Sequence, residues 1–335
     1  MLRFFIPILL LGVCVPLGTM ALVQPISGDL SRIGFLPERS FGWNAPQPRI
    51  WDTPSNAAPA DAKIVVVGDS FTWTGRWQST AFRNRESYIS FGFGEICADI
   101  GDYFRASGLA PDVVIIETIE RLFAQRFLSK CAKSDLKASL PNATAPTRPQ
   151  RDTDIFHGSF GAKYALGGLL YLASPGPQHR TGHSGGVDVL PVPNGCARFS
   201  HADCGYALFL GEDVLLPSLP LTEYESPMIA YLKAAGVKTI IIMSIPNKTS
   251  IYLSPLEQAR QSDAYLAEFA RRNEVQALQL HDLFMKLKDM HRDFYFGNDT
   301  HLSYRGMTLL GEQVHDMVQS RVGAADVSSR VRDAR

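Results

Sequence analysis

A serine and a histidine in two short polar motifs are the residues of this sequence best suited to nucleophilic chemistry. Residues 68–71 read Gly-Asp-Ser-Phe and place Ser70 directly after a run of β-branched residues. Residues 298–303 read Asn-Asp-Thr-His-Leu-Ser, so Asp299 and His301 stand two positions apart. In an extended loop such side chains point to the same side, so the acid can hold one ring nitrogen of the histidine. The other nitrogen can then take the proton of a serine hydroxyl, which is the chemistry of acyl transfer.

Each motif also has a purely structural interpretation. Gly, Asp and Ser favour turns, so residues 68–70 taken alone are consistent with an ordinary turn. Residues 298–303 taken alone are consistent with a helix start that carries a surface histidine. We favour the catalytic interpretation because both motifs are expected at the carboxyl edge of the same sheet, where open α/β proteins bind ligands.

Four short apolar runs predict the strands of that sheet, at residues 63–68, 112–117, 238–244 and 277–280. Such runs are typical of strands buried on both faces of a parallel sheet. Helices are expected at residues 93–106, 227–235, 255–273 and 304–322. The third has a clear start signal, with Ser254 as cap, Pro255 at the first helical position and Glu257 completing a capping box. Alternating strands and helices predict an α/β fold with a parallel sheet.

The other segments surround or interrupt one predicted catalytic domain, residues 61–322. Residues 26–60 are rich in Pro, Ser, Asn and Ala and are expected to be an extended lead-in. Residues 132–225 break the strand–helix alternation and are interpreted as a long insertion that contains one helix, from Ala162 to Ala173. Residues 323–335 are expected to be a polar tail.

The N-terminal segment predicts export from the cytoplasm. After Arg3, residues 4–23 are almost continuously apolar, and about 20 such residues are enough to cross a bilayer. Residues 1–25 are therefore interpreted as an uncleaved membrane anchor, or as a signal peptide cleaved after the small-x-small sequence at 19–21. In both interpretations the rest of the chain leaves the cytoplasm.

Cysteine usage agrees with export. Setting Cys14 aside, an even number of cysteines remains, which suggests disulfides in an exported protein. Cys196 and Cys204 flank a short polar loop and are expected to pair, which leaves Cys97 and Cys131 as the other pair. Buried free thiols are the alternative.

Charge and histidine spacing exclude several classes of partner. The 335 residues carry 33 Lys+Arg and 33 Asp+Glu, so no basic excess is available to neutralise phosphates and no nucleic acid is expected. His179, His183 and His201 could suggest a metal site. The spacing of His179 and His183, however, would help bind a metal only on a helix, which the surrounding Gly, Pro and Thr oppose. No metal and no cofactor are therefore predicted.

The two polar motifs together resemble those of the SGNH/GDSL hydrolase superfamily, with Gly-Asp-Ser near the N-terminus and Asp-Thr-His near the C-terminus. The resemblance implies a flavodoxin-like three-layer fold with a parallel sheet. It also implies a Ser-His-Asp triad, which falls here on Ser70, His301 and Asp299. It covers about residues 64–122 and 238–320 and leaves the insertion out.

Two further segments are similar to the alginate O-acetyltransferase branch of that superfamily. Residues 115–121 read Ile-Ile-Glu-Thr-Ile-Glu-Arg, and residues 246–252 read Pro-Asn-Lys-Thr-Ser-Ile-Tyr. The sequence departs from the ordinary SGNH pattern in its Asp-x-His spacing and in lacking the oxyanion-hole asparagine after the second strand. It departs from the alginate-type pattern in its order, because the serine precedes the Asp-His motif.

The resemblance implies an exported O-acetyltransferase that acetylates a polysaccharide through an acyl-serine, as in exopolysaccharide biosynthesis. A membrane-bound acyltransferase is the expected partner that supplies acetyl groups. The expected location is the periplasmic side of the inner membrane, or the periplasm after signal cleavage. A carbohydrate or lipid esterase with the same triad is one alternative, and a non-catalytic polysaccharide-binding or assembly protein is another.

Residues near the two motifs are the candidates for holding the oxyanion or the substrate. Lys248 could bind an acidic sugar or the donor, or be a solvated lysine. Trp73 could stack on a sugar ring or pack under its loop. Arg121 could reach the oxyanion or form a structural ion pair with Glu120. The full set of candidates is Asp69, Trp73, Gly94, Glu117, Arg121, Lys248 and Tyr252.

Overall fold

The structure, a computed structural model, describes residues 2–50, 57–83, 87–92, 104–105, 107–128, 161–174, 182–184, 186–215, 219–220 and 222–333. Side chains are described over these ranges except at residues 2–6, 182–184 and 321–333. The chain divides into two compact units. Unit 1 comprises Met1–Gln47, Asp152–Leu216 and Lys286–Ser303, and unit 2 comprises Pro48–Arg151, Pro217–Met285 and Tyr304–Arg335.

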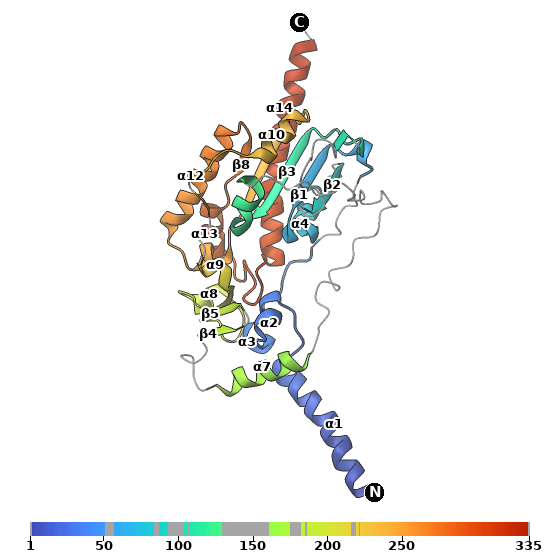
Figure 1. Cartoon of the computed structure of the whole chain (residues 1–335), viewed down its shortest axis with the longest axis vertical. Coiled ribbons are helices and arrows are strands. Elements are labelled where there is room, and N and C mark those ends of the chain that lie inside the picture. The colour runs from blue at the N-terminus through green and yellow to red at the C-terminus, as the bar shows by residue number, and fades with distance from the viewer. Residues whose placement is uncertain are drawn as a thin grey trace. The chain divides into compact units, whose positions relative to one another are not determined.

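Unit 2 is built around a five-stranded parallel sheet (Figure 1). Its strands are β1 (Ile64–Gly68), β2 (Tyr88–Gly92), β3 (Val113–Ile119), β7 (Thr239–Ile245) and β8 (Gln276–Leu278). They lie in the order β2-β1-β3-β7-β8, and every neighbouring pair is parallel. The predicted α/β class with a parallel sheet is confirmed.

The strands found by sequence agree with the structure to within two residues at each end. The largest differences are at β3, which ends two residues later than predicted, and at β8, which ends two residues earlier. Strand β2 was missed, because its sequence Tyr-Ile-Ser-Phe-Gly places a serine and a glycine among three apolar residues. It is nevertheless a full partner of β1. Most of the helix predicted at residues 93–106 lies outside the described residues.

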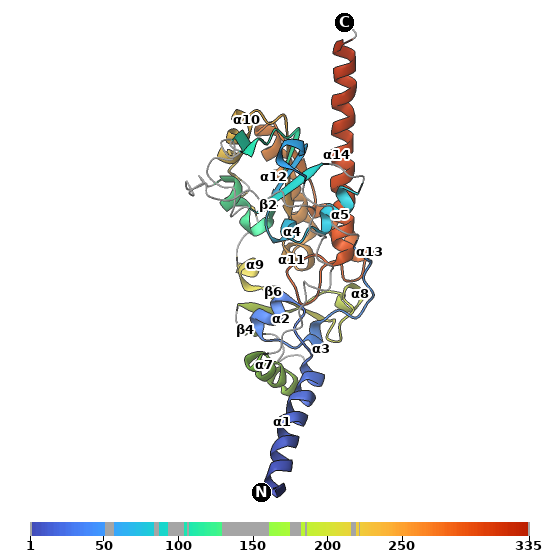
Figure 2. The ribbon, with the colours of Figure 1, turned by 90° about the vertical axis from the view of Figure 1, so that its right-hand side faces the viewer.

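Helices cover the sheet because its strands are apolar on both faces. On one face, strand residues such as Val67 and Ile116 pack with α10 (Pro227–Ala234) and α12 (Leu256–Arg272). The intervening strand residues, including Val66, are also buried and point to the opposite face. Figure 2 shows α5 and α14 side by side, away from α10.

Short helices occupy the loops of unit 2. They are η1 (Pro59–Asp61), α4 (Ser70–Trp73), α5 (Arg76–Ala81), η2 (Glu120–Leu122), η3 (Ala124–Leu128) and α11 (Lys248–Tyr252). Helix α13 (His281–Met290) follows β8, and α14 (Tyr304–Asp333) is the last element. The α14 helix continues well past residue 322, through the segment expected to be a polar tail.

The start of α12 differs slightly from the prediction. Pro255 is its cap residue with extended backbone, so the helix begins at Leu256 and has no side-chain cap bond. Ser254 and Glu257 therefore do not form the expected capping box. A proline fits this position because it lacks the N–H that a helix start leaves unpaired.

Unit 1 has a small antiparallel sheet of its own, in the order β4-β5-β6. The strands are β4 (Gly182–Ser184), β5 (Val187–Pro191) and β6 (Tyr206–Leu210). Its helices are α1 (Leu2–Val23), α2 (Asp29–Gly34), α3 (Glu38–Phe41), α7 (Ala162–Ala173), α8 (Gly195–Arg198) and α9 (Gly211–Leu215). The helix predicted inside the insertion is present with the same bounds as α7.

The segment expected to be an extended lead-in differs from that expectation, because residues 26–47 contain α2 and α3. The reason is that this segment carries its own apolar residues, which need burial. They form a separate core with the antiparallel sheet, made of Leu30, Leu36, Phe41, Val187, Val189 and Leu208. Residues 26–47 of the lead-in and residues 152–216 of the insertion thus belong to one compact unit, where the sequence suggested two additions to a single domain.

The predicted disulfide Cys196–Cys204 is present. Cys97 and Cys131 lie outside the described residues, so their pairing stays a prediction. The apolar run expected at residues 4–23 coincides with most of α1, although the side chains of its first residues are not among those described. Among the residues whose side chains the structure describes, no helix is both long enough and apolar enough to cross a membrane.

Helix α14 is held against α5 by close contact between backbones. A Cβ atom on Gly311 would meet the Trp77 carbonyl oxygen and the Thr80 side chain at less than van der Waals distance. His315 Nδ1 lies 2.8 Å from the carbonyl oxygen of Ala81, one turn further along α14. Only glycine therefore allows this approach at position 311.

We expect Gly311→Ala to lower the free energy of unfolding by about 1–3 kcal/mol, because the added methyl group forces the helices apart. Urea denaturation measures this. Glu312→Ala on the exposed side of the same helix is the matched control and should change stability by less than about 0.5 kcal/mol. Equal stability of the two variants would contradict the packing argument.

Candidate functional site

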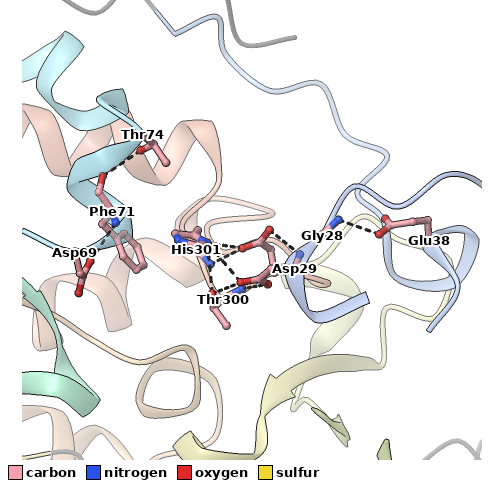
Figure 3. Close-up of polar contacts among 9 residues, drawn as sticks. Gly28, Asp29, Glu38, Asp69, Phe71, Thr74, Thr300 and His301 are labelled. Carbon is pink, nitrogen blue, oxygen red and sulfur yellow. Dashed lines mark hydrogen bonds and ion pairs between the residues drawn. The ribbon is translucent and has the colours of Figure 1, made fainter. Parts of the chain in front are cut away.

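Ser70 lies at the carboxyl end of β1, as the first residue of α4. Asp69 caps this helix, because its Oδ1 accepts a hydrogen bond from the backbone N–H of Phe71 at 3.1 Å (Figure 3). The other oxygen of Asp69 accepts a bond from the N–H of Ile119 at 2.7 Å. Asp69 therefore shapes the turn around Ser70 and ties it to the end of β3.

Glu117 supports the same turn from inside the sheet. Its side chain is fully buried, and its Oε2 accepts bonds from the Asp69 N–H at 3.0 Å and from the Thr72 hydroxyl at 2.8 Å. A side chain at Gly68 would collide with these same groups, so the glycine of the motif is required by space. Burial, with the nearby Asp69 carboxylate, raises the pKa of Glu117 well above its usual range. Glu117 is thus a neutral support for the Ser70 turn.

The carboxyl ends of β3 and β7 are joined by a second buried acid, Glu120. Its Oε2 accepts bonds from the Asn247 N–H at 2.8 Å and the Ser250 hydroxyl at 2.5 Å. Its Oε1 lies 3.0 Å from Nε2 of His281, a fully buried residue at the start of α13. Glu120 therefore pairs with His281, and an ion pair between Glu120 and Arg121 stays a prediction.

A carboxylate oxygen lies close to each ring nitrogen of His281. Its Nδ1 lies 3.2 Å from Oδ1 of Asp263, on α12. Burial lowers the pKa of His281, but Glu120 and Asp263 outweigh it and raise the pKa to about 9. The same pairing lowers the pKa of Glu120 and of Asp263 against their burial. The charged row Glu120–His281–Asp263 therefore links η2, α13 and α12, and the bond from Ser250 to Glu120 adds α11.

The remaining candidates of unit 2 lie around this edge. Lys248 and Tyr252 are both buried in α11, so the interpretation of Lys248 as a solvated lysine is wrong. The backbone N–H of Arg121 donates to Asn247 Oδ1 at 3.3 Å, which holds Arg121 beside the start of α11. Trp73 is 68% exposed at the end of α4, so packing under its loop does not describe it. Gly94 lies outside the described residues.

Asp299 and His301 make the contact that their spacing suggested. Asp299 Oδ1 lies 2.7 Å from Nδ1 of His301 and also accepts the backbone N–H of His301 at 2.9 Å. Burial raises the pKa of Asp299, but the pairing with His301 is stronger and lowers the pKa to about 2. Asp299 is therefore ionised near neutral pH and orients the imidazole through Nδ1.

A second acid, Asp29 at the start of α2, joins this loop in unit 1 (Figure 3). Its two oxygens accept the N–H of Thr300 at 2.9 Å and the Thr300 hydroxyl at 2.5 Å. Its own N–H donates to Asp299 Oδ2 at 3.1 Å. Burial and the charge of Asp299 raise the pKa of Asp29 to about 6.

The cluster of Asp29, Asp299 and His301 also has the donor types of a metal site. One ligand atom from each lies within 4.8 Å of the others. Both carboxylates, however, are already bonded by N–H and O–H groups of the loop and of α2. We therefore interpret the cluster as a hydrogen-bonded one, and the absence of a metal stays a prediction.

Glu38 fixes the other end of the loop. Its Oε1 accepts the N–H groups of Ser27 and Gly28, both at 2.9 Å, and its Oε2 lies 2.5 Å from the Asn298 side-chain nitrogen. Burial raises the pKa of Glu38. Of the histidines considered for a metal, His201 is a core residue whose Nε2 lies 2.8 Å from a backbone carbonyl oxygen.

The two halves of the predicted triad therefore belong to different compact units, Ser70 to unit 2 and the Asp299–His301 pair to unit 1. Sequence reasoning missed the acids and the histidine that support each half, which are Asp29, Glu38, Asp263 and His281. Each is polar yet separated from its partner by many residues, so no local spacing indicates the contact. The Gly-Asp-Leu sequence at residues 28–30 does signal a helix start, but not what that start contacts.

Comparison with known proteins does not assign the chain to a family. No protein-family model, curated protein or solved structure matches the chain.

We expect Glu117→Gln to change the free energy of unfolding by less than about 1 kcal/mol, because a neutral amide can replace a neutral carboxyl group. Glu117→Ala removes the acceptor and leaves a cavity, so it should cost about 3 kcal/mol. Urea denaturation at neutral pH compares them. A glutamine variant as unstable as the alanine variant would mean that Glu117 is ionised.

We expect stability to fall as the pH rises from about 6.5 to 9. The pKa of His281 is raised from 6.5 to about 9, so its stabilisation is complete below 6.5 and is lost as the folded protein loses this proton. The loss is on the order of 3 kcal/mol. The lowered pKa values of Glu120 and Asp263 come from the same pairing with His281, which is therefore also lost at acid pH when these carboxylates are protonated.

Urea denaturation across this range tests the expectation, with His281→Gln as the comparison. The variant should be less stable and should lack this part of the pH dependence. An NMR titration of the wild-type histidines provides a direct check, because a His281 that titrates near its ordinary value would contradict the charged row.

Proposed function

We propose that this chain is an exported O-acetyltransferase of the SGNH type that acetylates a polysaccharide through an acyl-serine. The observation that carries the proposal is the 2.7 Å contact between Asp299 Oδ1 and His301 Nδ1. An imidazole oriented in this way can present its other nitrogen to a serine. Ser70 is the proposed nucleophile, since it opens a helix at the carboxyl edge of a parallel sheet.

The strand order supports a flavodoxin-like SGNH fold for unit 2. Numbered along the chain, the sheet reads 2-1-3-4-5, which is the flavodoxin-like order. Its switch point lies between the first and third strands, β1 and β3, where such folds bind their ligands. Ser70 and Asp69 follow β1, and Glu120 follows β3, so the proposed nucleophile lies at that point.

The proposed reaction has two steps. In the first, Nε2 of His301 takes the hydroxyl proton of Ser70 while Oγ of Ser70 attacks the acyl carbon. His301 then gives that proton to the departing alcohol. In the second, a sugar hydroxyl gives its proton to His301 and its oxygen attacks the acyl carbon. The bond to Ser70 Oγ then breaks, and His301 returns the proton to this oxygen, which restores the Ser70 hydroxyl. The backbone N–H of Ser70 is the proposed donor to the oxyanion, and one such donor is worth about 3 kcal/mol.

The exposed ring of Trp73 supports a sugar polymer as the acyl acceptor. Trp73 follows the nucleophile by three positions, and its exposed ring offers a flat apolar face on which a sugar can stack. Lys248 and Arg121, near the ends of neighbouring strands, are the proposed contacts for a sugar acid or for the donor.

We further propose that the protein acts on the periplasmic side of the inner membrane, where a membrane-bound acyltransferase supplies the acetyl groups. The Cys196–Cys204 disulfide supports an oxidising compartment. Exposed apolar side chains along α1, such as Ile8 and Leu11, are consistent with attachment through residues 1–25.

Hydrolysis by the same residues is the second candidate. The Asp299–His301 contact serves either acceptor equally, since a histidine that deprotonates a sugar hydroxyl can also deprotonate water. The substrate would then be an acetylated carbohydrate or a lipid ester. Binding or assembly without catalysis is the third possibility.

One assay separates these functions. The full chain in detergent is given p-nitrophenyl acetate and a set of neutral and uronic-acid oligosaccharides, and the sugars are analysed by mass spectrometry. We expect acetylated sugar to accumulate. Release of acetate without acetylated sugar would favour the esterase, and no reaction would favour the non-catalytic alternative.

We expect Ser70→Ala and His301→Ala each to reduce this activity by at least about 1,000-fold. The matched control is Ser87→Ala, at the opposite end of the sheet, where the hydroxyl donates to the carbonyl oxygen of Asp61 in η1. It should leave the rate unchanged. Full activity in the Ser70 variant would exclude an acyl-serine at this position.

A further inference from the structure

The N-terminal part of unit 1 surrounds the Asp-Thr-His loop, although about 270 residues separate them in sequence. Asp29 is the central residue of this contact, because it bonds Thr300 through both carboxylate oxygens and Asp299 through its own N–H. The next two N–H groups, those of Leu30 and Ser31, donate to the carbonyl oxygen of Asn298 at 3.1 and 3.3 Å. The start of α2 therefore holds three consecutive residues of the loop, 298–300.

The Asp29 carboxylate also faces the histidine. Its Oδ2 lies 3.7 Å from Nδ1 of His301, the nitrogen that Asp299 contacts at 2.7 Å. Two carboxylates thus converge on one ring nitrogen. The nearer carboxylate orients the ring, while the farther one adds negative charge without displacing it. Such a charge favours the protonated imidazole, which is the state that forms when a histidine acts as a general base.

We propose that Asp29 is a positioning residue for the proposed acyl transfer, one that holds the Asp299–His301 pair in place and strengthens His301 as a base. The catalytic consequence of this inference rests on the proposed function. The effect of Asp29 on the pKa of His301 does not. Its contacts distinguish it from a residue that only fills space, because its N–H and both of its carboxylate oxygens bond to the loop.

The pKa of Asp29, raised to about 6, gives the proposal a pH signature. Below pH 6 Asp29 is mostly neutral, and an asparagine in its place imitates that state. Above pH 6 it is mostly ionised, so its negative charge acts on His301. The effect of removing the charge should therefore be large above pH 6 and small below it. His301, Asp299, Thr300 and the start of α2 are the groups that face Asp29.

The test is an NMR titration of His301 in the full chain labelled with ¹⁵N-histidine, comparing wild type with Asp29→Asn. The His301 signals are assigned with the His301→Gln variant. We expect the pKa of His301 to fall by about one unit when the carboxylate is removed, because a charge at this distance is only partly screened. An unchanged pKa in a folded variant would overturn the proposal.

Kinetics provide the second readout if the wild type shows acyl transfer or hydrolysis. Asp29→Asn should lower kcat about fivefold to tenfold without changing KM, and should shift the acid limb of the rate profile to lower pH by about one unit. A change confined to KM would overturn the positioning role. If the wild type shows no turnover, the proposed function fails while the titration still tests Asp29.

Two controls keep the test informative. Asp289→Asn makes the same chemical change on an exposed acid of unit 1 and should alter neither readout. Thr300→Val removes one of the bonds to Asp29 and serves if Asp29→Asn does not fold; it should lower kcat, and an unchanged kcat would overturn the proposal. Stoichiometric zinc in the wild type that is lost in Asp29→Asn would also overturn it, because the cluster would then be a metal site.

Discussion

A carboxylate buried in a protein needs hydrogen-bond donors or a positive charge, and this requirement organises both units of the molecule. Glu117 and Glu120 at the sheet edge, and Glu38 and Asp299 around the Asp-Thr-His loop, are all buried acids. Each one collects donors from segments that are distant in sequence. Hydrogen bonds to buried acids consequently hold the loops that carry the candidate residues, in addition to the helices and strands that these loops join.

The two acids of the sheet edge meet this requirement in opposite ways. Glu117 has hydroxyl and N–H donors but also the Asp69 carboxylate beside it, so its pKa rises and it is held neutral. Glu120 has His281 as a partner, so its pKa falls and the pair is charged. The charged pair lies further along the edge, where it links β3, α11 and α13.

The Asp-Thr-His loop shows how a local motif depends on distant support. The Asp299–His301 contact follows from a two-residue spacing in an extended loop, so the sequence predicted it directly. The loop itself, however, is bonded at Asn298 by Glu38 and at Thr300 by Asp29. These bonds act together with the burial of Leu30, Leu36 and Phe41, so residues 26–47 are folded against a core and are not an extended tether. Residues 26–47, which resemble a linker in composition, therefore help to hold the loop that carries His301.

The sequence by itself determined the features that depend on neighbouring residues. These are the four apolar strands of the sheet, the turn around Ser70, the helix within the insertion, the short-loop disulfide and the Asp-x-His pair. Their signals are alternation, capping and spacing, which act over a few residues. Only the tertiary structure decided the partners of the buried acids, the pairing of β2 with β1 and the division into two units. These contacts join residues as far as 271 positions apart, and which of them meet depends on the chain topology, which local preferences do not specify.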